Sequence, residues 1–194
     1  GGYHYTGGLI GGIYGYQHYG SDTIIVENCH VDGEVNGNGG LIGRAFTEAA
    51  PITISKCSAK VSGVLDPSGG GLIGQVDTYS SSGDITILEC FVNLVDGVIV
   101  GAGFVSSVSA VDGSILIKDC YVSGQDNINT YSGLITVLRA DSASSVTIEN
   151  CYSDATVSTG YPAGGLIGSM DAVDKYSEIE SSISSIPGTL TVKN

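Results

Sequence analysis

Two acidic side chains stand at matching places in neighbouring segments of similar sequence. Glu89 precedes the cysteine of ITILEC, and Asp119 precedes the cysteine of ILIKDC. Carboxylates held side by side repel each other, which raises the pKa of one of them and fits it for general acid catalysis on a glycosidic bond. The alternative, which we favour, is a solvated acidic pair on an outer surface. We therefore predict no catalytic residue at this position.

Other groups give little support to an enzymatic function. A polysaccharide lyase usually needs a basic residue, but Arg44 and Arg139 fall at different positions within their segments. The sequence has no GxSxG motif, and its glycine-rich blocks lack the Lys-Ser/Thr pair of a phosphate-binding loop. His4, His18 and His30 do not form an HExxH motif. We predict neither a metal site nor a cofactor.

A row of aromatic residues after the cysteines is the best candidate for a ligand-binding surface. The residues that directly follow the five cysteines are His30, Ser58, Phe91, Tyr121 and Tyr152. Alternation along a strand places this row on the outside if the cysteines point inward. Phe91, Tyr121 and Tyr152 would then form a flat strip suited to a sugar face or a protein partner. The alternative is that the rings stabilise this face of the fold or lie under a loop.

A second aromatic patch lies near the N-terminus, in the segments YHYTGG and YGYQHYG. We expect these side chains to cap the first turn of the fold or to contact a preceding domain. The tyrosines concerned are Tyr3, Tyr5, Tyr14, Tyr16 and Tyr19.

An internal repeat defines the elements that would position these residues. The block GGLIG occurs at residues 7–11, 39–43, 70–74 and 164–168. Two middle segments keep only part of the block, as GAGFVS and SGLIT. The five cysteines recur in phase with the blocks, and each ends a run such as IIVENC or ITISKC. Two independent markers with one period of about 31 residues establish the repeat.

Each repeat predicts three short strands. ITISKC alternates apolar and polar residues, CSAKVSGV supplies a second strand, and GGLIGQVD supplies a third. Three strands and three turns in about 31 residues match one coil of a parallel β-helix. We predict an all-β fold, a right-handed parallel β-helix of about five to six coils that forms a single domain over residues 1–194. Stacked glycines would allow a tight corner, and stacked cysteines would be buried free thiols.

Composition excludes several classes of partner. The 194 residues include 30 glycines and carry a formal net charge of −13. Nucleic acids and anionic membranes reward clusters of Lys and Arg, which this sequence lacks. The longest apolar runs are too short to span a bilayer. Because the only methionine is Met170, we expect the sequence to be a segment of a larger protein whose neighbouring domains contact it.

The combination of GGLIG with a β-rich run ending in NCY, as in ENCYSDATVS, resembles the GLUG repeat of bacterial surface and secreted proteins, which include some immunoglobulin A proteases. The resemblance covers essentially the whole chain and is weakest in the middle repeats. It implies an extracellular β-helical segment that is commonly one part of a larger surface protein. It carries no catalytic residues, because the protease chemistry of such proteins lies outside the repeats.

These observations favour a non-catalytic module on a bacterial surface or in a secreted protein. The module would present a side face to a glycan or a host protein, with Phe91, Tyr121 and Tyr152 as the candidate contacts, or would act as a rigid spacer. The alternative is a β-helical carbohydrate-active enzyme, either a polysaccharide lyase or a glycoside hydrolase. That alternative predicts a groove with clustered acidic and basic residues.

Overall fold

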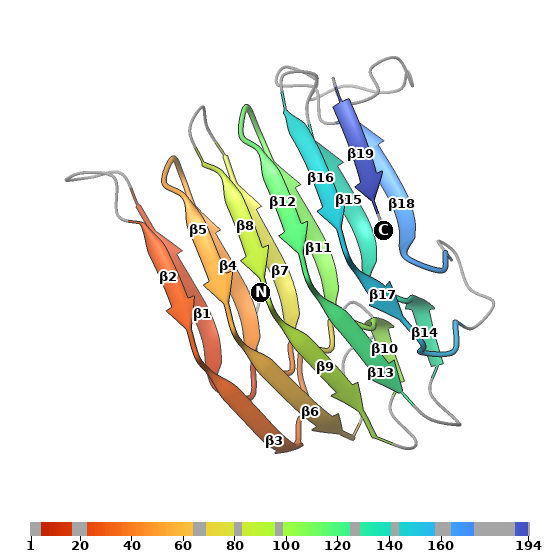
Figure 1. The fold of residues 1–194 in the computed structure, drawn as a ribbon. Helices are drawn as coiled ribbons and strands as arrows, with labels where there is room; N and C mark the ends of the chain where they lie inside the picture. Colours follow the sequence, from red (N-terminus) through yellow and green to blue (C-terminus); the bar gives the residue numbers. More distant parts are fainter. Residues whose placement is uncertain are drawn as a thin grey trace, which may run out of the picture.

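The computed structural model describes residues 5–16, 23–63, 69–79, 83–95, 99–124, 129–140, 144–157, 164–172 and 189–193. Every regular element in these ranges is a β-strand, which confirms the predicted all-β class. None of the described ranges forms a helix that could cross a membrane. Figure 1 shows the strands side by side, from β1 and β2 at one end to β18 and β19 at the other.

Three parallel sheets form the sides of the fold. The GLIG sheet contains the six strands that follow the glycine blocks, namely β1 (Ile10–Gly15), β4 (Ile42–Thr47), β7 (Ile73–Thr78), β11 (Val105–Ala110), β15 (Ile135–Ala140) and β18 (Ile167–Ala172). The Ile sheet contains six strands, namely β2 (Ile24–Glu27), β5 (Ile52–Ser55), β8 (Ile85–Leu88), β12 (Ile115–Lys118), β16 (Ser145–Glu149) and β19 (Thr189–Lys193). The post-cysteine sheet contains five strands, namely β3 (His30–Glu34), β6 (Ser58–Ser62), β9 (Phe91–Leu94), β13 (Tyr121–Gly124) and β17 (Tyr152–Ser153).

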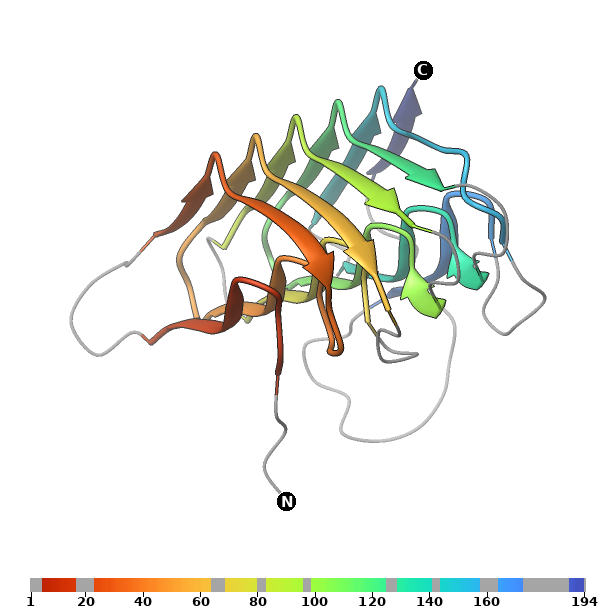
Figure 2. The ribbon, with the colours of Figure 1, turned by 90° about the horizontal axis from the view of Figure 1, so that it is seen from below.

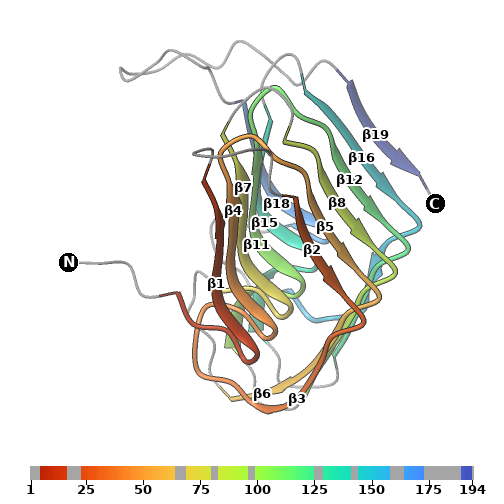
Figure 3. The same cartoon turned by 90° about the vertical axis from the view of Figure 1, so that its left-hand side faces the viewer.

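Strand pairing is parallel and keeps the repeat in register. Ile42 of β4 pairs with Ile10 of β1 on one side and with Ile73 of β7 on the other. In Figure 3, which views the end with β1 and β2, the chain runs clockwise down β2, along β3 and up β4 while it moves away from the viewer. The solenoid is therefore right-handed, as expected for parallel crossover connections. Figure 2 shows one corner, between the Ile and post-cysteine sheets, repeated from coil to coil.

Alternation along the strands separates core from surface. In β5, Ile52 and Ile54 are fully buried and Thr53 between them is half-buried. Register places Ile52, Ile85 and Ile115 next to one another, so like residues stack through the interior. Burial of apolar surface contributes about 25 cal/mol per Å² and is the main stabilising contribution in such a stack.

The cysteines form the predicted interior ladder. All five are free thiols, and four of them, Cys57, Cys90, Cys120 and Cys151, are buried. The Sγ of Cys57 donates to the Ser55 carbonyl oxygen at 3.1 Å, and this contact to the residue two positions earlier recurs along the ladder. A hydrogen bond to the next thiol, together with burial, raises the pKa of Cys57 and Cys120, so these groups stay protonated and unreactive.

The GGLIG block forms a corner where successive coils approach closely. A Cβ on Gly40 would overlap the carbonyl oxygen of Gly71, and a Cβ on Gly71 would overlap the carbonyl oxygen of Gly103. The same relation holds from Gly103 to Gly133. Only glycine permits this approach, which explains the second glycine of each block that is followed by another glycine block.

The middle repeats depart from GGLIG where the chain forms an additional sheet. Ala102 and Ser132 stand in place of the first glycine and end β10 (Ile99–Ala102) and β14 (Asn129–Ser132), which pair with each other. The hydroxyls of Ser132 and Thr136 lie 3.1 Å apart, and Thr136 donates to the Gly101 carbonyl oxygen at 2.8 Å. Side-chain hydrogen bonds therefore support this corner in coils that lack the full glycine block.

The residue before each cysteine turns the corner between the Ile and post-cysteine sheets with a left-handed backbone. Its φ is 54° at Asn28, 53° at Lys56, 52° at Glu89, 54° at Asp119 and 52° at Asn150. Asparagine adopts this conformation readily, whereas an ordinary side chain is disfavoured there by about 1 kcal/mol. The corner is therefore strained at Lys56 and Glu89.

Replacing Lys56 by glycine is expected to stabilise the protein by about 0.5–1 kcal/mol, because glycine removes the steric penalty of the positive φ. Equilibrium unfolding in urea would measure the effect. Lys60→Gly in β6 is the matched control, since Lys60 is also exposed but lies within a strand, where glycine is destabilising. A lower midpoint for Lys56→Gly would contradict the left-handed corner.

Candidate functional site

The two carboxylates considered for acid catalysis, and predicted instead to be a solvated pair, lie on the exposed corner. Glu89 and Asp119 are both solvent-exposed, and Asp119 Oδ1 accepts a hydrogen bond from Asn150 Nδ2 at 2.9 Å. A carboxyl that acts as a general acid is typically enclosed in a cleft, whereas both of these side chains lie open to solvent. This position supports the interpretation as a solvated acidic pair.

The structure describes one of the three histidines and both arginines. His4 and His18 lie outside the described residues, and His30 Nδ1 is 2.7 Å from Ser58 Oγ. Over the described part of the chain, no group of three His, Cys, Asp or Glu side chains could hold a metal ion. Arg44 pairs in register with Gln75, whereas Arg139 pairs with Ser109, so the two arginines occupy different rows of the GLIG sheet.

The predicted aromatic row lies on the outer face, but its geometry differs from a flat strip. The ring centroids of Phe91 and Tyr121 are 5.2 Å apart with planes 7° from parallel, and those of Tyr121 and Tyr152 are 5.3 Å apart at 5°. Parallel rings this close stack face to face, because rings laid edge to edge need a wider spacing than neighbouring strands provide. The π-faces of the row thus cover one another. A binding role for these three residues remains a prediction.

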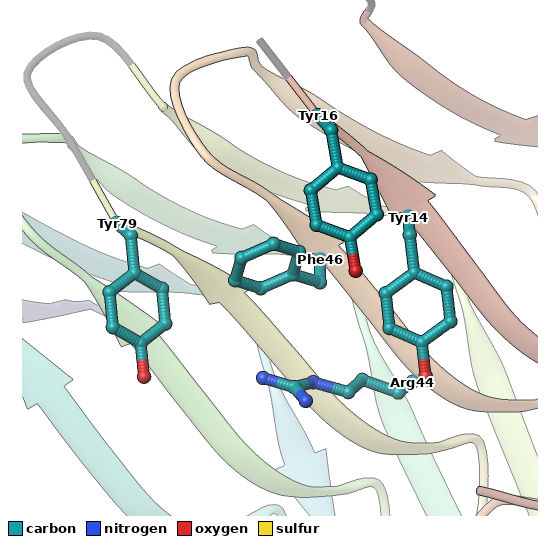
Figure 4. A pocket seen from close by; sticks show the side chains of 5 residues that line it. All are labelled: Tyr14, Tyr16, Arg44, Phe46 and Tyr79. Carbon is teal, nitrogen blue, oxygen red and sulfur yellow. The ribbon is translucent and has the colours of Figure 1, made fainter. Parts of the chain in front are cut away.

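A second group of rings surrounds a hollow on the outer face of the GLIG sheet. We call it the aromatic hollow; it has a volume of about 270 Å³ and is lined by Tyr14, Tyr16, Arg44, Phe46 and Tyr79. Tyr14 and Tyr16 stack 6.2 Å apart, and the Phe46 ring lies tilted between Tyr16 and Tyr79 at 5.9 Å and 5.5 Å. Figure 4 shows the three tyrosine hydroxyls pointing toward the side where Arg44 lies.

Strand alternation brings these residues together from three coils. In β4, Ala45 is fully buried, so Arg44 and Phe46 on either side of it point outward. Tyr14 pairs in register with Phe46, while Tyr16 and Tyr79 directly follow the paired ends of β1 and β7. This group keeps much ring surface open, since Tyr16 is 55% and Tyr79 is 61% exposed.

Arg44 is held in place by a buried carboxylate. Its Nη2 lies 2.8 Å from Asp77 Oδ2 and its Nε donates to the same oxygen at 3.0 Å, with side-chain exposures of 18% for Arg44 and 3% for Asp77. Nη1 donates to the Tyr5 hydroxyl at 3.1 Å, and the guanidinium carbon lies 4.9 Å from the Tyr5 ring centre and 5.0 Å from that of Phe46. The guanidinium therefore fixes two rings by cation–π contact.

Burial raises the pKa of the Asp77 carboxyl above its ordinary value, while the neighbouring Arg44 and a hydrogen bond from Gln75 oppose this shift. Desolvation acts to lower the pKa of Arg44, but the charge of Asp77, the hydrogen bond to it and the nearby Tyr5 and Tyr14 together outweigh desolvation and raise the pKa of the guanidinium overall. Arg44 is therefore positively charged, and Asp77 supplies the balancing negative charge beneath the hollow.

Sequence reasoning identified only part of the aromatic hollow. The N-terminal tyrosines were expected to cap the first coil or contact a preceding domain, and Phe46 and Tyr79 were not singled out. Alignment of GGLIGGIYGY, GGLIGRAFTE and GGLIGQVDTY would have found them, because Tyr14 shares a column with Phe46 and Tyr16 shares one with Tyr79. Tyr3 and Tyr19 lie outside the described residues.

The parallel sheets, in-register repeats and interior ladders define this chain as a parallel β-solenoid. Residues 2–36 match the family described as the GLUG motif, which confirms the resemblance inferred from the repeats. No curated protein and no solved structure matches the chain.

Proposed function

We propose that this β-solenoid is a non-catalytic module that binds a glycan in the aromatic hollow, as part of a bacterial surface or secreted protein. The observation that carries the proposal is the hollow itself, in which four rings from three coils meet a fixed guanidinium. A surface of open rings with a few fixed polar groups is typical of ligand sites. The resemblance to GLUG-repeat proteins supports the extracellular setting.

A sugar fits this surface because it has apolar CH faces and a polar rim. Open ring faces such as those of Tyr16 and Tyr79 can pack against the CH groups of a pyranose. The tyrosine hydroxyls and the remaining N–H groups of Arg44 lie toward one side of the hollow, where they can bond the sugar hydroxyls (Figure 4). Because the site is built on strands that are locked in register, little entropy is lost when the ligand binds.

Charge favours an uncharged glycan. The positive charge of Arg44 is balanced by Asp77 at 2.8 Å, and the chain as a whole carries −13. A polyanionic glycan would meet this net negative field without a free counter-charge from Arg44. We therefore expect neutral oligosaccharides to bind and the affinity to change little with ionic strength.

The arrangement supports binding rather than catalysis. A glycosidase needs two carboxylates that flank the bond to be broken. No carboxylate is among the described residues that line the aromatic hollow, and the nearby Asp77 is buried and paired with Arg44. A hydrolase or lyase therefore remains the less supported alternative.

Two triple variants would test the proposal. The first triple variant removes the open rings of the hollow and combines Tyr16→Ala, Phe46→Ala and Tyr79→Ala. It is expected to weaken glycan binding about a hundredfold or more, since a buried aromatic anchor contributes about 2 kcal/mol or more to binding. Phe91→Ala, Tyr121→Ala, Tyr152→Ala is the matched control with the same number of rings removed. It is expected to lower stability while retaining affinity.

Binding would be found first on an array of neutral and acidic glycans and then measured by titration calorimetry, with circular dichroism to check that both variants fold. Loss of binding in the folded hollow variant alone is the expected result. Loss in the Phe91, Tyr121 and Tyr152 variant alone would move the site to that row. Absence of binding to any glycan would favour a rigid spacer or a protein-binding module.

A further inference from the structure

A second depression lies on the same outer face, beside the aromatic hollow. It has a volume of about 250 Å³, and its lining is more polar than that of the hollow. We call it the polar depression. The side chains that matter for the argument are Tyr5, Asn38, Gln75, Ser107 and Arg139.

The two sites share a wall of hydrogen-bonded side chains. Asp77 accepts from Arg44, which lines the aromatic hollow, and from Gln75 Nε2 at 3.1 Å, which lines the polar depression. The Tyr5 hydroxyl accepts from Arg44 at 3.1 Å, and Tyr5 also lines the depression. The two sites are therefore neighbours on this face, joined through the contacts of Arg44 with Asp77 and Tyr5.

One hydroxyl of the polar depression has no partner. Ser107 Oγ is buried and makes no hydrogen bond, and it is the one such side-chain atom found in the described part of the chain. Buried polar atoms are nearly always hydrogen-bonded, so this unpaired hydroxyl gains a partner if the Ser107 side chain rotates toward a ligand in the depression.

The register sets the direction of the combined site. Arg44, Gln75 and Ser107 are consecutive neighbours across strands β4, β7 and β11. The aromatic hollow is built on β1, β4 and β7, whereas the polar depression extends to Val137 and Arg139 of β15. The two together therefore run across the strands, along the axis of the solenoid.

We propose that the polar depression is a second sugar subsite and that the ligand is a neutral oligosaccharide of two or more units lying across β4, β7 and β11. This inference rests on the proposed function. One sugar unit packs on the rings of the aromatic hollow, and the next places a hydroxyl against Ser107 Oγ and hydrogen-bonds with Gln75. The site thus selects chains over single sugars.

The test compares chain lengths of one neutral sugar series, from the methyl monoside to the hexasaccharide, chosen as the strongest binder among gluco-, manno-, xylo- and chito-oligomers. Affinity is expected to rise by about tenfold or more from the monoside to the short oligomers as the second subsite is filled. Ser107→Ala should weaken binding of the oligomers about threefold to tenfold and leave the monoside unchanged, because one hydrogen bond is lost.

Ser109→Ala is the matched control, since Ser109 lies on the same outer face of β11 but lines neither site. The Ser107→Ala variant is also expected to melt at a slightly higher temperature than the native protein, because an unpaired buried hydroxyl is removed, so weaker binding would not reflect misfolding. Equal affinity for monoside and oligomers, or an unchanged oligomer affinity in Ser107→Ala, would overturn the second subsite and leave the proposed function intact. If no saccharide bound at all, both proposals would fail.

Discussion

Replacing Gly71 by alanine is expected to destabilise the solenoid by about 3 kcal/mol or more, a large part of the stability of a typical domain. The added Cβ would overlap the backbone carbonyl oxygen of Gly103 in the next coil and press on Val92 of the interior. Neither backbone can move away without breaking hydrogen bonds, since Gly71 N donates to the Ala102 carbonyl at 3.0 Å and Gly103 N donates to the Ser132 carbonyl at 2.9 Å.

The chain offers a matched control for this substitution. Gly165 occupies the same place in the last GGLIG block, but a Cβ there meets no atom within 4 Å. Gly165→Ala should therefore change stability by less than about 0.5 kcal/mol. Urea unfolding of both variants, followed by circular dichroism, would measure the difference. If the two variants were equally stable, the close approach of the coils at Gly71 would be wrong.

Replacing Arg44 by alanine is expected to destabilise the protein by about 3 kcal/mol at neutral pH, as is usual when one partner of a buried ion pair is removed. The Asp77 carboxylate would remain buried with only the hydrogen bond from Gln75 and the more distant charge of Arg139 to stabilise it. The variant would also lose the cation–π contacts of the guanidinium with Tyr5 and Phe46.

The loss of stability caused by Arg44→Ala should depend on pH in a defined direction. Burial already raises the pKa of Asp77 in the folded protein, and loss of Arg44 removes the main influence that lowers it. A carboxyl with a raised folded-state pKa binds more protons in the folded state, so the free energy of unfolding falls as pH rises from the ordinary Asp value of about 4 through the folded value. The difference between the native protein and the variant should therefore be greatest near neutral pH and smallest in acid.

A second substitution separates the charge from the packing. Arg44→Ala combined with Asp77→Asn leaves no buried charge and should recover about 1–2 kcal/mol relative to Arg44→Ala alone, with a weaker dependence on pH. Unfolding midpoints measured across the acid to neutral range would provide the comparison. A destabilisation that is constant with pH in Arg44→Ala would show that Asp77 is not held as a buried carboxylate.

The fold can be predicted from the sequence because the cysteines and the GGLIG blocks recur for two different physical reasons. The spacing of the cysteines predicts interior ladders, and the GGLIG blocks predict corners without side chains; Cys90 and Gly71 confirm each in turn. In a solenoid each coil repeats its neighbour, so a period read from the sequence directly predicts which residues are adjacent in space. The extra β10–β14 sheet was missed, because the loss of a glycine indicates only that the corner differs.

The candidate site was harder to predict because it depends on which outward-facing side chains of neighbouring strands come into contact. Alternation predicts that Phe46, Tyr79 and Asp77 lie outside the core, but it does not predict that neighbouring side chains bury Asp77 on that outer face. For Phe91 and Tyr121, the sequence predicts adjacency but not the orientation of the rings. Ring orientation decides whether aromatic faces are free for a ligand, and it is set by packing between coils.

The most direct measurement of the central claim is an NMR experiment that locates a bound oligosaccharide. In protein labelled at Tyr and Phe rings, the account predicts intermolecular nuclear Overhauser effects from the sugar CH protons to Tyr16, Phe46 and Tyr79, which surround the aromatic hollow. Contacts confined to Phe91, Tyr121 and Tyr152, or to no aromatic residue at all, would contradict it.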